Sequence, residues 1–246
     1  MPNYKLTIQY EGTRYKCWQE QKHTEATIQG KLQRVLERMT EEEIDLQGSG
    51  RTDAGVHAKG QIAHFHTKAV WDVEEIKKYM NEYLPEDIAI LQVEQVDGRF
   101  HSRLNAKSKT YEYRIYKGSK PDVFARRYVW PMEEKLDVAK MREAAGHLTG
   151  THDFMAFCGN RRMKKTTVRT IYQIEIEETE HEIRMRFTGS GFLQNMVRIL
   201  TGTLVEVGRG ERTPEDMEWI LKSRDRQQAG FLMPAKGLTL MEVKYK

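Results

Sequence analysis

The stretch Gly48-Ser49-Gly50-Arg51-Thr52-Asp53-Ala54-Gly55-Val56-His57-Ala58 lies at the centre of the predicted fold of this 246-residue chain. Three glycines within eight residues allow the backbone to turn sharply. A short apolar segment at residues 44–47 precedes the stretch, and an alternating segment at residues 61–67 follows it. Both segments are typical of strands. The sequence therefore predicts a tight glycine-rich loop between two strands.

The segments around this loop predict a β-α-β-β-α-β unit over the first hundred residues. Apolar and polar side chains alternate at residues 4–10, as in a half-buried strand. Asp72 is placed to cap a helix that Pro85 ends. The predicted order is a strand at 4–10, a helix at 28–39, strands at 44–47 and 61–67, a helix at 73–84 and a strand at 88–96.

The remainder of the chain predicts the same order with one added helix. Tyr111 and Tyr113 share one face of a strand at residues 110–116. Gly208 is expected to follow the end of an apolar helix at residues 192–207. The other expected elements are helices that begin at Asp137 and at 213–216, and strands at 168–176, 182–187 and 238–245.

Together these patterns predict an α+β fold of two ferredoxin-like halves, residues 1–104 and 105–246. We expect an extended, mostly antiparallel sheet with helices on one face and a central basic cleft. The N-terminus has no apolar signal core, and no stretch is long enough to span a membrane. Cys17 and Cys158 lie far apart in sequence, so both are expected to be free thiols of a cytoplasmic protein.

Basic residues are unevenly distributed, although the formal net charge is only +4. Nine basic residues lie between residues 99 and 127, against two acidic ones. A second basic block lies at residues 161–165. Such segregation favours a surface for a polyanion such as a nucleic acid, and a merely solvated surface is the alternative. The residues expected to contact phosphates are Arg99, Arg103, Lys107, Arg161, Arg162, Lys164 and Lys165.

Asp53 is the strongest candidate for chemistry. A carboxylate in a glycine-rich loop beside Arg51 is ionised and exposed, and is therefore available as a nucleophile. The alternative is an Asx turn, in which Asp53 caps the next element. Arg51 is placed to pair with this carboxylate or with a phosphate. His57 is suited either to acid–base chemistry or to hydrogen bonding within the loop.

Two further features accompany this loop. Arg198 lies in an apolar helical segment, so its guanidinium either reaches the surface or is buried against a carboxylate, for which Asp53 is the most plausible partner. Tyr111 and Tyr113 are either core aromatics or, for at least one of them, a ring that stacks on a displayed base.

The motifs of several enzyme classes are missing from the sequence. His64 and His66 point the same way on a strand, but no third ligand is evident, so no metal site is expected. The sequence has no G-x-x-x-x-G-K-[ST], G-x-G-x-x-G, H-E-x-x-H, C-x-x-C or G-x-S-x-G motif. An enzyme of this sequence would work without a nucleotide cofactor or metal. One alternative is a non-catalytic RNA-binding or chaperone module of the same fold. Another is a carboxylate-dependent hydrolase, which normally needs a second carboxylate.

The ordered set of motifs resembles the tRNA pseudouridine synthase A (TruA) family nearly end to end. Residues 50–58 match the family signature G-R-T-D-A-G-V-H-A/G. Two positions depart from the family pattern, since Cys17 replaces a glycine and Ser102 replaces an alanine. The further matching segments are residues 10–12, 18–21, 84–88, 100–103, 109–113, 150–154, 191–198 and 234–238.

The resemblance implies a cofactor-independent isomerase that converts uridine to pseudouridine in the tRNA anticodon stem-loop, at positions 38–40. The base would be detached at N1, turned while bound, and rejoined to the ribose through C5. The resemblance further implies that the partners are tRNA and a second copy of the chain in a homodimer.

The resemblance also implies roles for single residues. Asp53 would be the nucleophile, Tyr111 would stack on the uracil, and Arg198 would pair with Asp53. Arg51 would help to extrude the target nucleotide or contact its backbone. Attack of Asp53 on C6 of the base, attack on C1′ of the ribose, and promotion of a glycal intermediate all stay open.

Overall fold

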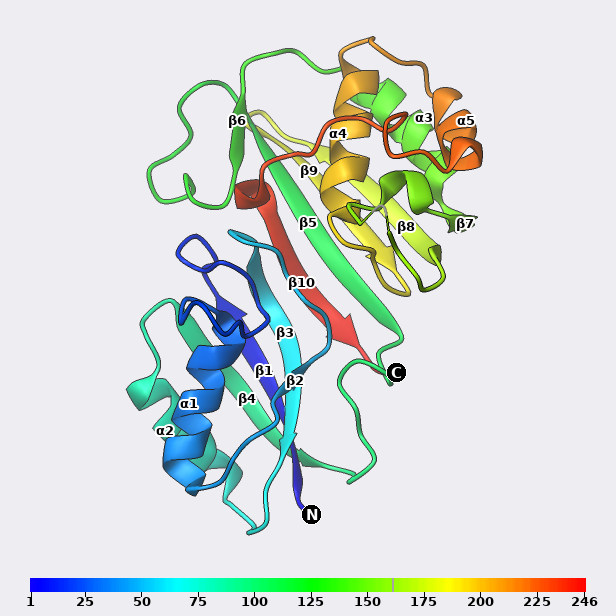
Figure 1. Ribbon diagram of the computed structural model, residues 1–246. Coiled ribbons are helices and arrows are strands. Elements are labelled where there is room, and N and C mark those ends of the chain that lie inside the picture. Colours follow the sequence, from blue (N-terminus) through cyan, green and yellow to red (C-terminus); the bar gives the residue numbers. More distant parts are fainter. Residues whose placement is uncertain (161) are drawn as a thin grey trace. The chain divides into compact units, whose positions relative to one another are not determined.

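The computed structural model describes residues 1–160 and 162–246, which form two compact units (Figure 1). The first unit consists of Met1–Lys107 and Leu240–Lys246, and the second consists of Ser108–Thr239. The expected second half, 105–246, therefore needs a correction at its end. The last strand crosses from one unit to the other between Thr239 and Leu240, and sequence periodicity does not say which sheet a strand joins.

The first unit has the predicted β-α-β-β-α-β order. Its strands pair in the order β4-β1-β3, with β1 antiparallel to both neighbours, and β3 also pairs with β2 and β10. Its elements are β1 (Asn3–Tyr10), α1 (Ile28–Thr40), β2 (Gln47–Gly48), β3 (His57–His66), α2 (Val73–Tyr83), β4 (Ile88–Val96) and the part of β10 (Leu238–Lys244) that begins at Leu240.

Local signals explain these elements. Leu6 and Ile8 on β1 are fully buried, as the alternation predicts. The Asp72 side chain accepts from the backbone of Glu74 and Glu75 and so caps α2 as predicted. The helices α1 and α2 lie side by side against the sheet of this unit (Figure 1). The apolar core of the first unit lies between these helices and the sheet.

The second unit is also α+β and mostly antiparallel. Its strands pair in the order β5-β9-β8-β7, and β6 runs parallel to β5. Its helices pack together on one face of the sheet (Figure 1). Its elements are β5 (Ser108–Lys117), β6 (Trp130–Met132), α3 (Val138–Leu148), β7 (Gly150–Asp153), the 3-10 helix Met155–Phe157, β8 (Val168–Glu178), β9 (Glu182–Gly189), α4 (Met196–Gly208), α5 (Asp216–Ser223) and the 3-10 helix Ala235–Gly237.

The helix α4 corrects two details of the sequence prediction. It begins at Met196 rather than at residue 192, because Asn195 adopts a left-handed conformation with φ 60° and interrupts the helical backbone. Gly208 lies inside the helix rather than beyond its end. A Cβ atom at Gly208 would lie 2.8 Å from Sδ of Met141, so this glycine allows close packing of α3 and α4.

Among the described residues, no helix is long and apolar enough to cross a membrane. Both cysteines are free, as predicted, and Cys158 is buried.

Candidate active site

The Asp53 loop connects β2 and β3 and is held by backbone hydrogen bonds at both ends. The Ser49 amide donates to the Ile62 carbonyl at 2.7 Å, and the Trp18 amide donates to the Thr52 carbonyl at 3.0 Å. The Val56 amide closes a turn on the Asp53 carbonyl at 3.2 Å, and Gly55 takes φ 76°, a value that favours glycine. Asp53 is half-buried at the surface of this fixed loop.

The N-terminal Tyr10-Glu11-Gly12 motif supports the same loop. A Cβ atom at Gly12 would lie 2.0 Å from the Val56 carbonyl oxygen, so only glycine permits this approach. The Gly12 amide donates to Nδ1 of His57 at 3.0 Å, and His57 is 1% exposed. The structure therefore gives His57 the loop hydrogen bond that the sequence left as an alternative to acid–base chemistry.

Cys17, which replaces the family's glycine, lies next to Asp53. The two residues form an isolated antiparallel bridge. The Cys17 thiol donates to the Gln19 carbonyl at 3.1 Å and accepts from Nε2 of Gln21 at 3.1 Å. Burial raises the pKa of the Cys17 thiol, and the negative charge of Asp53 also contributes. The thiol is therefore kept protonated, and its contacts order the segment in front of α1.

Arg51 and Arg103 line one cavity of about 240 Å³ in the first unit. Arg51, on the Asp53 loop, and Arg103, which follows β4, are both exposed. The sequence predicted substrate contacts for both without placing them together. His101 lines the same cavity and was missed, although it stands two residues before Arg103 in a recognised motif. Asp45 also lines this cavity, so its two cations leave a net positive charge there, which suits a phosphate group.

Tyr111 lies on β5 in the second unit, with its ring against Phe192. The two ring centroids are 5.3 Å apart with an interplanar angle of 86°, an edge-to-face contact. Tyr113 is fully buried, and its hydroxyl donates to the Pro234 carbonyl at 2.8 Å. Burial raises the pKa of Tyr113, so its hydroxyl stays a neutral donor. Tyr113 is thus a core aromatic. Tyr111, 7% exposed, borders the partly exposed Phe192.

Arg198 is half-buried on α4 of the second unit. Its Nε donates to the Met233 carbonyl at 2.6 Å, and Nη1 donates to Oδ1 of Asn195 at 3.3 Å. The Met233 amide in turn donates to the Arg198 carbonyl at 3.3 Å. These contacts hold the guanidinium in one direction. An arginine that only extends to the solvent does not need such contacts. The ion pair with Asp53, which belongs to the first unit, stays a prediction.

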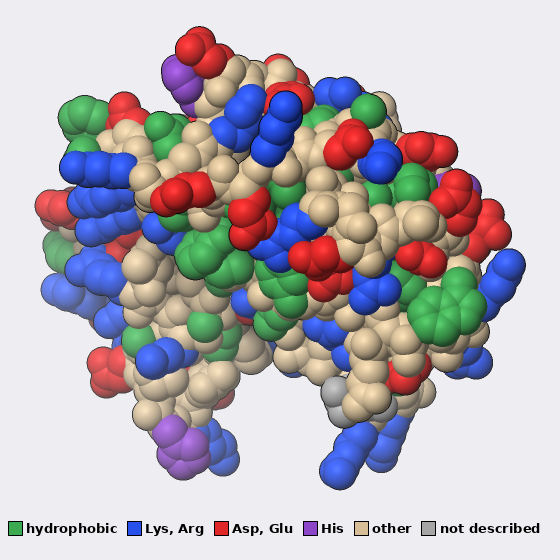
Figure 2. All heavy atoms as spheres, turned by 90° about the horizontal axis from the view of Figure 1, so that it is seen from above, with side chains coloured by type: hydrophobic (Ala, Val, Ile, Leu, Met, Phe, Trp, Pro, Cys, Tyr) green, Lys and Arg blue, Asp and Glu red, His purple; other side chains and the backbone are tan. Residues whose placement is uncertain are grey.

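Most of the expected phosphate contacts are exposed side chains. Arg99, Arg103 and Lys107 lie in the first unit, and Arg162, Lys164 and Lys165 lie in the second. Arg161 lies outside the described residues. Figure 2 shows basic side chains interspersed with acidic ones over most of the face seen there, with Lys and Arg gathered at its left edge.

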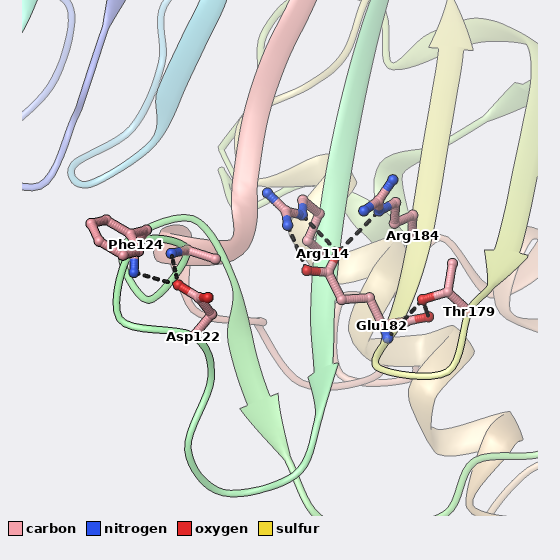
Figure 3. Close-up of polar contacts among 7 residues, drawn as sticks. Arg114, Asp122, Phe124, Thr179, Glu182 and Arg184 are labelled. Atoms are coloured by element: carbon pink, nitrogen blue, oxygen red, sulfur yellow. Dashed lines mark hydrogen bonds and ion pairs between the residues drawn. The ribbon is translucent and has the colours of Figure 1, made fainter.

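Part of the basic segment 99–127 is neutralised within the second unit. Arg114 pairs with Glu182 at 2.5 Å, and Glu182 also accepts from Arg184 at 3.0 Å (Figure 3). From the same strand as Arg114, Lys117 pairs with Glu178 of β8 at 2.9 Å. Counting charges along the chain therefore overstated the basic character here, because cross-strand partners are invisible in sequence.

His64 and His66 lie on β3 as predicted, with ring centroids 5.8 Å apart. Nδ1 of His64 accepts from the Ser102 amide at 3.2 Å. Burial, reinforced by the neighbouring His101, lowers the pKa of His64 to about 4, so it is neutral near pH 7. Among residues 1–160 and 162–246, no group of three or more His, Cys, Asp or Glu side chains is placed to hold a metal ion.

Comparison with known proteins gives one consistent result. A family model described as tRNA pseudouridine synthase matches residues 6–104 and 144–246. The chain is 48% identical over 245 residues to "tRNA pseudouridine synthase A" of Bacillus sp. (strain KSM-64), covering 100% of both chains. It is 44% identical to "tRNA pseudouridine synthase A 2" of Bacillus anthracis and 44% identical to "tRNA pseudouridine synthase A 1" of Clostridium tetani, again over 100% of each chain.

One likeness to a solved structure is distant. A chain in a crystal structure of a Cbf5-Nop10-Gar1 complex shares 11% sequence identity with a TM-score of 0.41. The match spans 96% of the present chain and 48% of that one.

The family model and the full-length relatives at this identity together define an RNA-modifying isomerase. The chain belongs to the tRNA pseudouridine synthase family. The expected family, the isomerase class and the coarse function, pseudouridine formation in tRNA, are confirmed.

Proposed function

We propose that this enzyme isomerises uridine in the anticodon stem-loop of tRNA, at positions 38–40, with Asp53 as the nucleophile. The main support comes from the Asp53 loop. Backbone hydrogen bonds hold this loop on both sides of Asp53, while Asp53 itself remains partly exposed. A nucleophile needs this combination of a fixed direction and access to substrate.

Each neighbouring group supports one part of the reaction. Arg51 is exposed at the cavity that it shares with Arg103, which suits contact with the backbone of an extruded nucleotide. Tyr111 is proposed to stack on the uracil beside the partly exposed Phe192, whose ring it contacts, and Arg198 has a fixed guanidinium for pairing with Asp53. Isomerisation breaks the bond from C1′ to N1 and forms the bond from C1′ to C5. N1 then gains a proton and C5 loses one, so no redox partner is required.

The deciding experiment compares the wild type with Asp53→Asn and Asp53→Ala. The substrates are tRNA transcripts with uridine at positions 38, 39 or 40 and otherwise identical transcripts with cytidine there. We expect pseudouridine only in the uridine transcripts and a loss of turnover of at least about a thousandfold in both variants, with tRNA binding retained.

Normal turnover by Asp53→Ala would overturn the role of Asp53. Tight tRNA binding with no product at any enzyme concentration would instead indicate a non-catalytic binding module. Pseudouridine at other positions would overturn the proposed target while leaving the reaction in place.

The same proposal includes a cytoplasmic homodimer. It rests on the resemblance of the motifs, and on full-length similarity to relatives of the same length. Light scattering over a range of concentrations tests the assembly. A mass of about one chain, 28.9 kDa, at every concentration would contradict it.

A further inference from the structure

A chain of buried polar side chains lies behind the Asp53 loop in the first unit. Two of its members, Ser49 and Thr52, belong to the loop, while Tyr10 ends β1 and Gln61 lies on β3. Their exposed fractions are 0%, 5%, 3% and 0%. Burying four polar side chains is costly unless they are hydrogen-bonded, so their partners are informative.

The amide of Gln61 lies at the centre of this chain. Its Oε1 accepts from the Ser49 hydroxyl at 2.8 Å and from the Ile62 amide at 3.2 Å. Its Nε2 donates to the Gly50 carbonyl at 2.9 Å and to the Tyr10 hydroxyl at 3.5 Å. Both donors and both acceptor positions of the amide are therefore used. Two of the four bonds reach the loop just before Arg51 and Asp53.

The hydroxyl of Tyr10 continues the chain to the other side of Arg51. It lies 2.8 Å from Oγ1 of Thr52. The phenol oxygen therefore contacts both Gln61 and Thr52, and either hydroxyl of the Tyr10–Thr52 pair can be the donor. Burial raises the pKa of Tyr10, which the bonds to Thr52 and Gln61 only partly oppose. The phenol thus stays protonated throughout the range in which an RNA enzyme is assayed.

A register shift brings these residues to the loop. Ile8 pairs with Gln61, but Tyr10, two residues on, pairs with Ala58 rather than with residue 59. Such bulges re-aim side chains and are frequent beside active sites. At this one, Gly60 also permits close approach of the Met241 carbonyl, which a Cβ atom would meet at 2.6 Å.

We propose that Tyr10, Gln61 and Thr52 are positioning residues that set the direction of the Asp53 carboxylate from behind the loop. The inference rests on the proposed role of Asp53 as the nucleophile. The three side chains are buried, so they act through the loop backbone and not on the substrate. They fix residues 49, 50 and 52, which leaves Asp53 little freedom to turn. Misplacement of a reacting group by about 1 Å costs on the order of a hundredfold in rate.

Tyr10→Phe tests the proposal, with Tyr4→Phe as a matched control. Tyr4 lies on the same strand, is fully buried, and bonds through its hydroxyl to the Trp71 carbonyl at 3.1 Å and the Trp71 amide at 2.7 Å. Both variants lose one buried hydroxyl. For Tyr10→Phe we expect kcat to fall about ten- to a hundredfold with KM for tRNA within about twofold. For Tyr4→Phe we expect kcat within about twofold of the wild type, and thermal melts establish that both variants fold.

Thr52 provides a second and independent arm. Thr52→Val keeps the shape and removes the hydroxyl, whereas Thr52→Ser keeps the hydroxyl. We expect Thr52→Val to lower kcat about tenfold and Thr52→Ser to restore it to within about threefold. Because Tyr10 and Thr52 share one hydrogen bond, the double variant Tyr10→Phe with Thr52→Val should lose little more than the more damaging single variant.

The outcomes separate this inference from the proposed function. Wild-type kcat in both Tyr10→Phe and Thr52→Val, beside an inactive Asp53→Asn, overturns the positioning role alone. An equal loss of kcat in Tyr4→Phe and Tyr10→Phe also overturns it, because general destabilisation then suffices. Normal turnover by Asp53→Asn overturns the proposed nucleophile itself.

Discussion

The Asp53 loop of the first unit and the Tyr111–Arg198 region of the second are held by different physical means. Hydrogen bonds among buried polar groups hold the loop in place. Tyr111 is held by an edge-to-face contact with Phe192, and Arg198 projects from a regular helix, where its Nε donates to the Met233 carbonyl. A hydrogen bond can be removed without leaving a cavity, whereas an aromatic contact cannot. Substitutions can therefore change the geometry of the Asp53 loop by smaller amounts than they can change the geometry around Tyr111.

The largest effect that sharpens this comparison is expected from Arg198→Met. Methionine fills most of the volume on α4 but carries no charge, so the fold should persist while the proposed partner of Asp53 disappears. We expect kcat to fall about a hundredfold, or about 2.7 kcal/mol in activation free energy, with tRNA affinity nearly unchanged. Single-turnover assays and tRNA titration measure the two quantities.

Arg142→Met provides the control for this experiment. Arg142 lies on α3 and its Nε also donates to a backbone carbonyl, that of Ile176, at 2.9 Å. The variant should keep wild-type kcat. Unchanged turnover in both variants would show that Arg198 serves only the packing of α4.

The second prediction concerns acid stability. His64 in the first unit has a folded-state pKa of about 4 against an ordinary value of 6.5, because burial and the nearby His101 disfavour its charged form. The unfolded chain therefore binds the proton first. The stability contributed by neutral His64 is complete above pH 6.5 and is lost as the pH falls towards 4. We expect a loss on the order of 2 kcal/mol in the unfolding free energy, measured by urea titration, and a much flatter profile for His64→Gln.

Glu182 in the second unit provides the contrast in the same titrations. Burial disfavours its ionised form, but hydrogen bonds from Arg114 and Arg184 outweigh burial and hold the pKa of Glu182 below its ordinary value of 4.5. Its contribution is present above pH 4.5 and is lost as the pH falls through the lower folded-state pKa. Glu182→Gln should therefore change the profile only below about pH 4.5. Overlapping profiles for the two variants would contradict this assignment.

The smallest effects are expected from single exposed cations. Arg103→Ala in the first unit and Lys164→Ala in the second should each weaken tRNA binding a few-fold and reduce the salt slope of binding by about one. Lys117, which pairs with Glu178 at 2.9 Å, supplies the control Lys117→Ala, with a smaller change in slope. An altered slope for Lys164→Ala but not for Arg103→Ala would confine the tRNA contact to the second unit.

The sequence predicted what depends on local pattern. Alternation identified β1, and the caps at Asp72 and Asp137 identified the starts of α2 and α3. It did not predict β6 and β7, because edge strands of three and four residues carry too little periodicity. A conformation set by one residue, such as Asn195 before α4, also has no periodic signal.

The residues of the candidate site also separate into those that the sequence identified and those that it did not. Asp53, Arg51 and Arg198 stand in recognisable motifs. In the network behind the loop, Tyr10 and Thr52 also lie in matched segments, but Gln61 does not. Their contact has no sequence signal, because Tyr10 and Gln61 are 51 residues apart and meet only through the pairing of β1 with β3. The partner of Arg114, Glu182, is likewise 68 residues away. Motifs identify single residues, whereas the contacts between those residues depend on strand register.

The placement of β10 has a consequence for synthesis of the chain. The ribosome completes Met1–Lys107 and then makes the whole of Ser108–Thr239. Only after that does it make the part of β10 that belongs to the first unit and pairs with β3. At roughly 5–20 residues per second, that interval lasts about 7–26 s. During it, the β3 edge beside Gly60 has no neighbour from β10, and the Ser102 carbonyl lacks its bond from the Tyr245 hydroxyl. The unit that holds Asp53 is the first to be started and the last to be completed.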